Sequence, residues 1–254
     1  MLPDELITEL CIYAFILGAC LGSFVTLASY RLPLGEDIIS KPSRCPKCET
    51  KLGWKDLFPL LSWIFARAKC RHCKAPVHFR YPLTELLLAI TFMGITYVYG
   101  QSLQTVLLCA LATELAVMIV TDFEHTIIPD SVQVALGITG ILYCIYHDVE
   151  WTQPALCVAV AGGLGLVLHY GYPYFRKKEG LGFGDVKFLF VVGLWIPLTA
   201  FPVFLFIAGL VGTVTGLLWK LRKDKEGEIF PFGPALALSL FICVLEPNLL
   251  ARFY

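Results

Sequence analysis

The sequence predicts an all-α polytopic membrane protein with about eight transmembrane helices and a small cytoplasmic zinc-binding insert between helices 1 and 2. Of its 254 residues, 57% are hydrophobic and only 16% are charged, against roughly 25% charged in a typical soluble domain. Long apolar runs recur along most of the chain, and two CxxC pairs stand in a basic stretch. This composition excludes a disordered chain, a fibrous protein and a small disulfide-rich scaffold.

Eight apolar runs predict the membrane spans. They cover residues 6–30, 83–99, 103–121, 132–147, 154–172, 186–198, 200–219 and 232–246. A transmembrane helix needs about 20 apolar residues, with a range of about 17–25. The runs at 132–147, 186–198 and 232–246 are short, so each could begin inside protein or be re-entrant. Buried core helices are the alternative, but this many apolar runs are difficult to hide from lipid.

The distribution of charge predicts the orientation of the spans. The chain carries 20 Lys and Arg and 20 Asp and Glu, but residues 31–80 hold 11 of the former and 4 of the latter. Most other basic residues form two clusters, which are Arg176, Lys177, Lys178 and Lys187, and then Lys220, Arg222, Lys223 and Lys225. Eight spans with residues 31–80 in the cytoplasm place every basic residue except Arg252 on that side, as the positive-inside rule requires. Seven or nine spans would divide the clusters, so we expect both termini outside the cytoplasm.

This reading divides the chain into three parts. We expect a first transmembrane helix in residues 1–30, a tetra-cysteine insert in residues 31–80 and a seven-helix membrane domain in residues 81–254. The first apolar run lacks a basic start and is too long for a cleaved signal. The basic residues occupy short gaps between apolar runs, which argues against a nucleic-acid-binding surface.

Four of the ten cysteines predict a metal site. Cys45, Cys48, Cys70 and Cys73 form CPKC and CRHC with 21 residues between them. Four thiolates at this spacing suit one tetrahedral zinc ion, and four sulfur ligands leave no open position, so the ion is structural. Two disulfides are the alternative, but the cytoplasm is a reducing compartment. The six cysteines in apolar runs are interpreted as small buried hydrophobic residues.

Two carboxylates are candidates for catalysis. Asp122 ends the third span, and Asp185 follows the loop GLGFG and opens the sixth. Two spans separate them, so alternation places both at the inner membrane face. Two carboxylates that meet near a low-dielectric surface share a proton. One then activates a water while the other donates to a scissile carbonyl. The sequence lacks GxSxG and HExxH motifs, so peptide hydrolysis by an aspartic pair is the reading that we favour.

Other residues near these acids are assigned supporting roles. Gly182 and Gly184 permit another backbone to approach closely, so with Lys187 they are expected to form the active-site loop. Asp185 could alternatively be only a helix N-cap, and we read Asp130 mainly as a cap with a possible supporting role. Glu85 begins the second span and is also a possible supporting residue. Glu114 lies about 12 Å before Asp122 along the same helix, too far for the pair.

The motifs resemble those of the type IV prepilin leader peptidases, membrane aspartic proteases of the GxGD kind. They agree in order and spacing almost from end to end. They are GSF at 22–24, RLP at 31–33, the two CxxC pairs, PLLSW at 59–63, RYPLTE at 80–85, Asp122 followed by IPD at 128–130, and GFGD at 182–185.

The resemblance implies a function. Asp122 and Asp185 match the catalytic aspartates, and the substrates are prepilins or the pilin-like subunits of secretion and DNA-uptake machines. Members remove a short basic leader at the cytoplasmic face of the bacterial inner membrane, and many methylate the new N-terminus with S-adenosylmethionine. Two departures fall in the N-terminal part associated with methyl transfer. Thr26 replaces a usual Asn, and Leu57 stands where Asn-Ile-Pro often begins.

Three alternatives remain open. The chain could be a peptidase that has lost methyl transfer. It could be a proton-coupled transporter, which would favour acids at mid-bilayer and an inverted repeat. It could be a scaffold whose insert docks partners. Membrane lipid is an expected partner, because the basic insert can engage anionic headgroups.

Overall fold

The computed structural model describes residues 4–172, 174, 180–221 and 230–246. Within these ranges the regular elements are helices, and the only β pairing is two isolated bridges, Arg44 with Lys51 and Lys69 with Pro76. The chain forms two compact units, Met1–Val117 and Met118–Tyr254, whose boundary falls inside one helix. Each unit is described below by itself.

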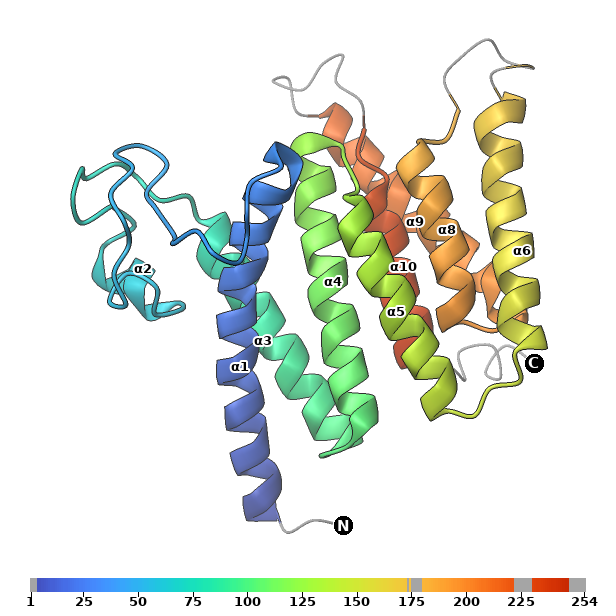
Figure 1. Ribbon diagram of the computed structural model, residues 1–254, viewed down its shortest axis with the longest axis horizontal. Coiled ribbons are helices and arrows are strands. Elements are labelled where there is room, and N and C mark those ends of the chain that lie inside the picture. The colour runs from blue at the N-terminus through green and yellow to red at the C-terminus, as the bar shows by residue number, and fades with distance from the viewer. Residues whose placement is uncertain (1–3, 173, 175–179, 222–229, 247–254) are drawn as a thin grey trace. The chain divides into compact units, whose positions relative to one another are not determined.

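Every predicted apolar run is a helix, which confirms the all-α fold class (Figure 1). The long helices are α1 (Asp4–Arg31), α3 (Arg80–Tyr99), α4 (Leu103–His125), α5 (Asp130–Tyr146), α6 (Thr152–Leu166), α8 (Phe183–Trp195), α9 (Phe201–Lys220) and α10 (Gly233–Leu245). Five segments within the described residues are long and apolar enough to cross a membrane. Helices α5, α8 and α10 have 17, 13 and 13 residues, so the count of eight spans stays a prediction.

The first unit is built on the packing of α1 against α3. Two glycines of α1 let the helix backbones approach closely. A Cβ atom on Gly18 would lie 2.8 Å from Ala89 Cα, and one on Gly22 would lie 2.5 Å from Glu85 Cα. No side chain other than hydrogen fits at these positions, so the glycines fix where the helices meet.

The insert between these helices contains little regular structure. It begins with the 3-10 turn η1 (Leu32–Leu34) and contains one short helix, α2 (Leu61–Phe65). The buried guanidinium of Arg31 donates hydrogen bonds to the backbone carbonyls of Asp37, Lys41 and Pro42 at 2.8–2.9 Å. These bonds satisfy the arginine and fix the path of the chain as it leaves α1.

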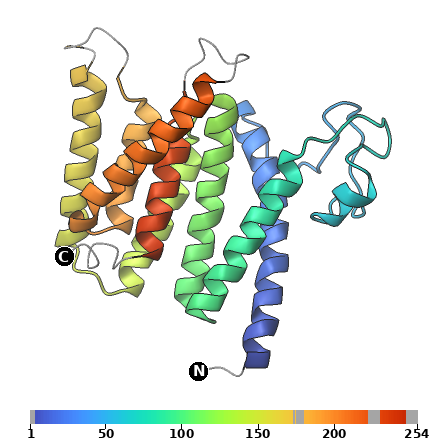
Figure 2. The same ribbon diagram turned by 180° about the vertical axis from the view of Figure 1, so that it is seen from behind.

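The second unit packs α8 between α5 and α6. A Cβ atom on Gly193 would lie 2.3 Å from the backbone nitrogen of Val158 in α6. On the other side of α8, the buried indole of Trp195 donates to the Leu136 carbonyl in α5 at 3.0 Å. Helices α9 and α10 pack against each other, as the view from behind shows (Figure 2). Residues Val167–Gly171 continue α6 as a π-helical segment, η2.

The ends of several helices lie together in the second unit. The last turns of α4 and the first turns of α5, α8 and α10 lie at its upper end in Figure 1. Polar contacts described below join all four. The basic residues at 176–178, 222, 223 and 225, which are predicted to be cytoplasmic, lie outside the described residues. So does Arg252, which is predicted on the other side of the membrane.

Candidate active site and metal centre

Asp122 is a buried acid near the end of α4. Its side chain is 6% exposed, and its Oδ2 accepts a hydrogen bond of 2.8 Å from the backbone N–H of Gly233. Gly233 is the first residue of α10, where helix N–H groups lack partners within the helix. The positive end of α10 therefore faces the carboxylate and compensates part of its burial.

Asp185 lies in the first turn of α8 and is half-buried. Its carboxylate interacts with the backbone N–H of Gly182, the residue that caps this helix. An acid three positions into a helix that reaches back to the cap residue is half of a capping box. Asp185 therefore supports the start of its own helix but is not itself the N-cap, and its second carboxylate oxygen has further acceptor capacity.

The structure brings Asp122 and Asp185 together. Both belong to the second unit, and they are close enough for their negative charges to repel one another. Like charges in this relation make it costly for both carboxylates to be ionised at once. Such a pair offers one basic oxygen and one acidic hydrogen to a bound water and a carbonyl.

The glycine loop before Asp185 is held from two sides. Gln133 of α5 donates through Nε2 to the Gly184 carbonyl at 3.3 Å. On the other side, His169 Nδ1 of η2 lies 2.6 Å from the Leu181 carbonyl. A Cβ atom on Gly184 would lie 3.3 Å from Ile128 Cβ, and one on Gly182 would lie 3.1 Å from the Asp185 carboxylate. The loop is therefore closely packed at Gly184, whereas Gly182 is exposed and approaches only the Asp185 carboxylate.

The interpretation of Asp130 as a helix cap is wrong. The cap of α5 is Pro129, and Asp130 is the first helical residue, with no side-chain capping bond from the cap position. Its carboxylate instead pairs with Lys187 Nζ at 2.6 Å. The lysine also lies 5.2 Å from the centre of the Phe183 ring. The two side chains are 72% and 40% exposed, so this pair links α5 to α8 at the surface.

The four cysteines of the insert form a cluster that can hold a metal ion. The four Sγ atoms lie within 4.8 Å of one another, and Cys45 Sγ is 3.9 Å from Cys73 Sγ. A tetrahedral zinc with Zn–S bonds of about 2.3 Å separates its sulfurs by about 3.8 Å. The cysteine positions fit such an ion, which agrees with the predicted ligand set.

The two cysteine pairs occupy equivalent turns. In the first turn Glu49 N–H donates to the Cys45 carbonyl, and in the second Lys74 N–H donates to the Cys70 carbonyl. The residue after each second cysteine has positive φ, 57° at Glu49 and 60° at Lys74. The Thr50 hydroxyl and backbone lower the pKa of Cys48 to about 6, whereas desolvation and the neighbouring thiols raise the pKa of Cys73 to about 11. Of these two cysteines, Cys48 is the one held ready as the thiolate that a metal requires.

Glu85 joins the insert to the helices of the first unit. Its buried carboxylate accepts the backbone N–H of Leu60 at 2.7 Å and interacts with the Ser23 hydroxyl of α1. Leu60 has φ 61° and ψ −54°, and Leu61 N–H bonds to the Pro59 carbonyl, so these residues form a γ-turn. This conformation is strained for a leucine, and the bond to Glu85 helps to hold it.

The two departures from the family motif differ in their surroundings. Thr26 is 4% exposed, and its hydroxyl donates to the Ser23 carbonyl within α1. Leu57 lies in the insert with a side chain that is 41% exposed. Glu114 lies half-buried in α4, two helical turns before Asp122.

Two residues of this region were missed by sequence reasoning. Gly233 and Gln133 contact the aspartate and the glycine loop, yet neither belongs to a motif whose chemistry is evident from spacing. The FGP at 232–234 signals only a helix start, because proline is favoured in the first turn. For Gln133, the available signal was its position as a polar residue within the apolar run at 132–147.

Comparison with known proteins gives the same family along most of the chain. Residues 16–99 match the Bacterial Peptidase A24 N-terminal domain, and residues 109–217 match the Type IV leader peptidase family. A Prepilin leader peptidase/N-methyltransferase of Pectobacterium carotovorum subsp. carotovorum is 32% identical over 249 residues, 88% of each chain. One from Myxococcus xanthus is 33% identical, covering 94% of this chain and 73% of the relative. No solved structure matches the chain.

Proposed function

The chain belongs to the type IV leader peptidase family, and we propose that it removes the leader of prepilins or pilin-like proteins with Asp122 and Asp185 as the catalytic pair. The observation that carries this proposal is the electrostatic interaction of two partly buried carboxylates at one end of the second unit. The relatives are named peptidase/N-methyltransferases, so the activity includes methylation of the new N-terminus.

Hydrolysis follows from the shared proton. The ionised carboxylate of the pair takes a proton from a bound water, and that water attacks the scissile carbonyl carbon. The protonated partner donates its hydrogen to the carbonyl oxygen as the tetrahedral intermediate forms. The C–N bond then breaks, and the leaving amine receives a proton from the pair. The Gly233 N–H holds Asp122 in position through this cycle, and the Gly182–Gly184 loop is the surface for the substrate backbone.

Methyl transfer is proposed for the part of the chain that matches the N-terminal domain. S-adenosylmethionine is the expected methyl donor. Thr26 and Leu57 both fall in this part, so they are the first positions to examine if cleavage and methylation differ in efficiency. The Thr26→Asn variant tests this point, since methyl incorporation equal to that of the wild-type chain would show that the departure is harmless.

The tetra-cysteine cluster is proposed to hold a structural zinc ion. Residues 31–80 contain few buried apolar side chains in the described structure, and the four thiols are the largest concentration of ligands there. A zinc ion bound by four cysteines stabilises such a segment without taking part in hydrolysis.

The protein is proposed to lie in the bacterial inner membrane with the insert in the cytoplasm. The apolar spans support a membrane location, and the excess of Lys and Arg in residues 31–80 supports the orientation. A pilin precursor presents its basic leader on the same side, where the aspartates are proposed to act.

Co-expression with a pilin precursor tests the function directly. The mass of the product reports removal of the leader and addition of one methyl group in a single spectrum. We expect both changes with the wild-type chain. A precursor of unchanged mass, from cells in which the protein is present in the membrane, would contradict the proposal.

A further inference from the structure

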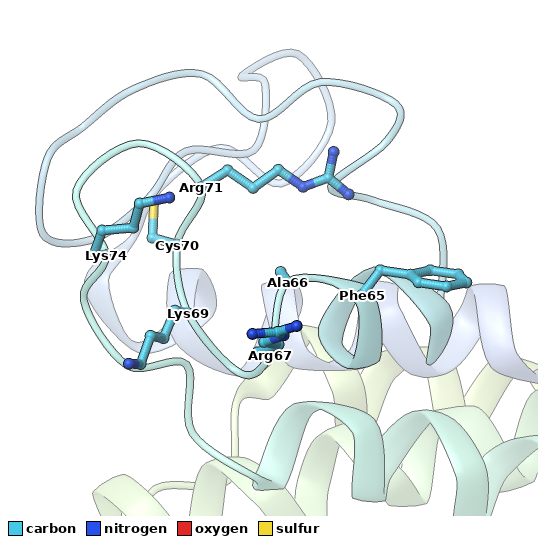
Figure 3. A pocket seen from close by; sticks show the side chains of 7 residues that line it. All are labelled: Phe65, Ala66, Arg67, Lys69, Cys70, Arg71 and Lys74. Carbon is cyan, nitrogen blue, oxygen red and sulfur yellow. The ribbon is translucent and has the colours of Figure 1, made fainter.

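A pocket of about 450 Å³ lies beside the second cysteine turn of the first unit. Its lining residues come from the end of α2 and from the chain that follows: Phe65, Ala66, Arg67, Lys69, Cys70, Arg71 and Lys74. In the view of Figure 3, Lys74 and Arg71 lie along the upper edge and Lys69 and Arg67 along the lower edge. The volume is in the range of roughly 300–1,000 Å³ that is common for ligand sites.

The basic side chains of this pocket have few carboxylate partners. Arg71 pairs with Asp56 at 3.1 Å and donates to the Lys55 carbonyl. Arg67, Lys69 and Lys74 have no ion pair among the residues that the structure describes. The lining contains no carboxylate, and its one thiol, Cys70, belongs to the four-cysteine cluster. The three cations around the opening therefore form a site for a polyvalent anion.

The backbone fixes where these cations stand. Arg67 and Ala68 have φ of 53° and 57°, an uncommon conformation for residues with a side chain. Hydrogen bonds hold it, from Ala68 N–H to the Trp63 carbonyl at 2.9 Å and from Val77 N–H to the Ala68 carbonyl at 2.7 Å. Lys74 is fixed by its own turn, through the bond to the Cys70 carbonyl. The cations are therefore carried on a defined loop.

Exposed apolar side chains stand in the pocket wall at Phe65 and in the chain segment that leads to it. Within α2, Leu61, Ile64 and Phe65 are 45%, 59% and 75% exposed. Just before α2, Trp54 and Phe58 are 75% and 55% exposed. Exposed aromatic and aliphatic side chains next to Lys and Arg are typical of segments that lie at the membrane interface.

We propose that this pocket binds the phosphate of an anionic phospholipid headgroup while the exposed side chains of α2 enter the adjoining lipid. The basic side chains favour binding of an anion, and the exposed apolar side chains of α2 favour an anion that is joined to acyl chains. A soluble phosphate would use the cations but gain nothing from Ile64 and Phe65. Every residue that lines the pocket belongs to the first unit and both aspartates belong to the second, so we assign the pocket to anchoring of the insert.

The test compares two variants of the full-length protein with equal charge. The pocket variant is Arg67→Gln, Lys69→Gln, Lys74→Gln, and the control is Lys41→Gln, Lys47→Gln, Lys51→Gln, three exposed lysines elsewhere in the insert. Native mass spectrometry of each protein, exchanged from nanodiscs of phosphatidylglycerol or phosphatidylcholine, counts the retained lipids. We expect the wild type and the control to retain phosphatidylglycerol, and the pocket variant to bind it at least about tenfold more weakly.

A second pair of measurements separates lipid from soluble phosphate. Inorganic phosphate is titrated into the wild type in neutral detergent, and an Ile64→Ser, Phe65→Ser variant is exchanged from the same nanodiscs. The proposal predicts that the wild type binds inorganic phosphate weakly and that the serine variant retains less phosphatidylglycerol.

Tight binding of phosphate by the wild type, with unchanged lipid retention by the serine variant, would overturn the proposal in favour of a soluble anion. Equal loss of lipid in the pocket variant and the lysine control would overturn it in favour of general charge. Circular dichroism of each variant establishes that it is folded.

Discussion

Asp122 depends on a residue that has no side chain. Gly233 donates its N–H to the carboxylate, and a Cβ atom at this position would lie 2.7 Å from Oδ2 and 3.0 Å from Cγ. The backbone at the start of α10 can therefore approach the carboxylate this closely only because residue 233 is glycine.

We predict that Gly233→Ala lowers the rate of leader cleavage by about tenfold to a hundredfold, because displacement of a catalytic group by about 1 Å is costly. The control is Gly209→Ala in α9, where nothing lies within 4 Å of an added Cβ. Cleavage kinetics on a purified precursor measure the effect. Equal rates for the two variants would show that Gly233 does not position Asp122.

Gln133 supports the glycine loop in a different way. It is 5% exposed, and it donates to the Gly184 carbonyl while its Oε1 has no partner among the described residues. We predict that Gln133→Leu removes this hydrogen bond and leaves the Gly184 carbonyl without this donor, at a cost of about 1–3 kcal/mol. Because the loop is the proposed surface for the substrate backbone, the change raises KM more than it lowers kcat. Lys187→Gln removes an exposed pair worth about 1 kcal/mol or less. A larger effect from the lysine change would contradict this ranking.

At the scale of elements, the insert depends on its cysteines. Among the described residues of 31–80, only Arg31, Cys45 and Cys70 are buried, so packing alone does little to stabilise this segment. The two equivalent turns, with their matching hydrogen bonds and positive φ, bring four thiols to one point. A metal ion there replaces the hydrophobic core that the segment lacks.

We predict that Cys45→Ser or Cys73→Ser removes bound zinc and makes residues 31–80 sensitive to protease, while the helices remain. Metal analysis and limited proteolysis of the purified protein measure both effects. Cys20→Ser, an exposed cysteine of α1, is the control and keeps its zinc. Absence of zinc from the wild-type protein would end this assignment.

The helices were the most predictable elements, because each corresponds to an apolar run. The proximity of Asp122 and Asp185 was also predicted, because two intervening spans return the chain to the same side. The partners of these acids were not predictable. Gly233 is 111 residues from Asp122, and Gln133 is 51 residues from Gly184. Which backbone group meets which acid depends on tertiary packing, which local patterns do not encode. The interpretation of Asp130 as a cap failed for a local reason, since α5 begins one residue earlier than expected and Pro129 occupies the cap position.

For the whole molecule, the distribution of Lys and Arg is the basis of the predicted orientation. Gly35 and Gly100 are suitable sites for an inserted epitope, because both have positive φ and nothing within 4 Å of an added Cβ. We predict that an epitope after Gly35 is detected only when the inner membrane is opened, whereas one after Gly100 is detected from the outer side. Detection of both epitopes on the same side would contradict the single span, residues 83–99, that is predicted between them.

The central claim is that Asp122 and Asp185 act as one unit through a shared proton. The most direct measurement is the cleavage rate of a purified pilin precursor by Asp122→Asn, by Asp185→Asn and by the double variant. We predict that each single change abolishes cleavage as completely as both together, because members of a catalytic unit are strongly non-additive. Unchanged circular dichroism establishes that the variants are folded. Substantial cleavage by either single variant would contradict the account.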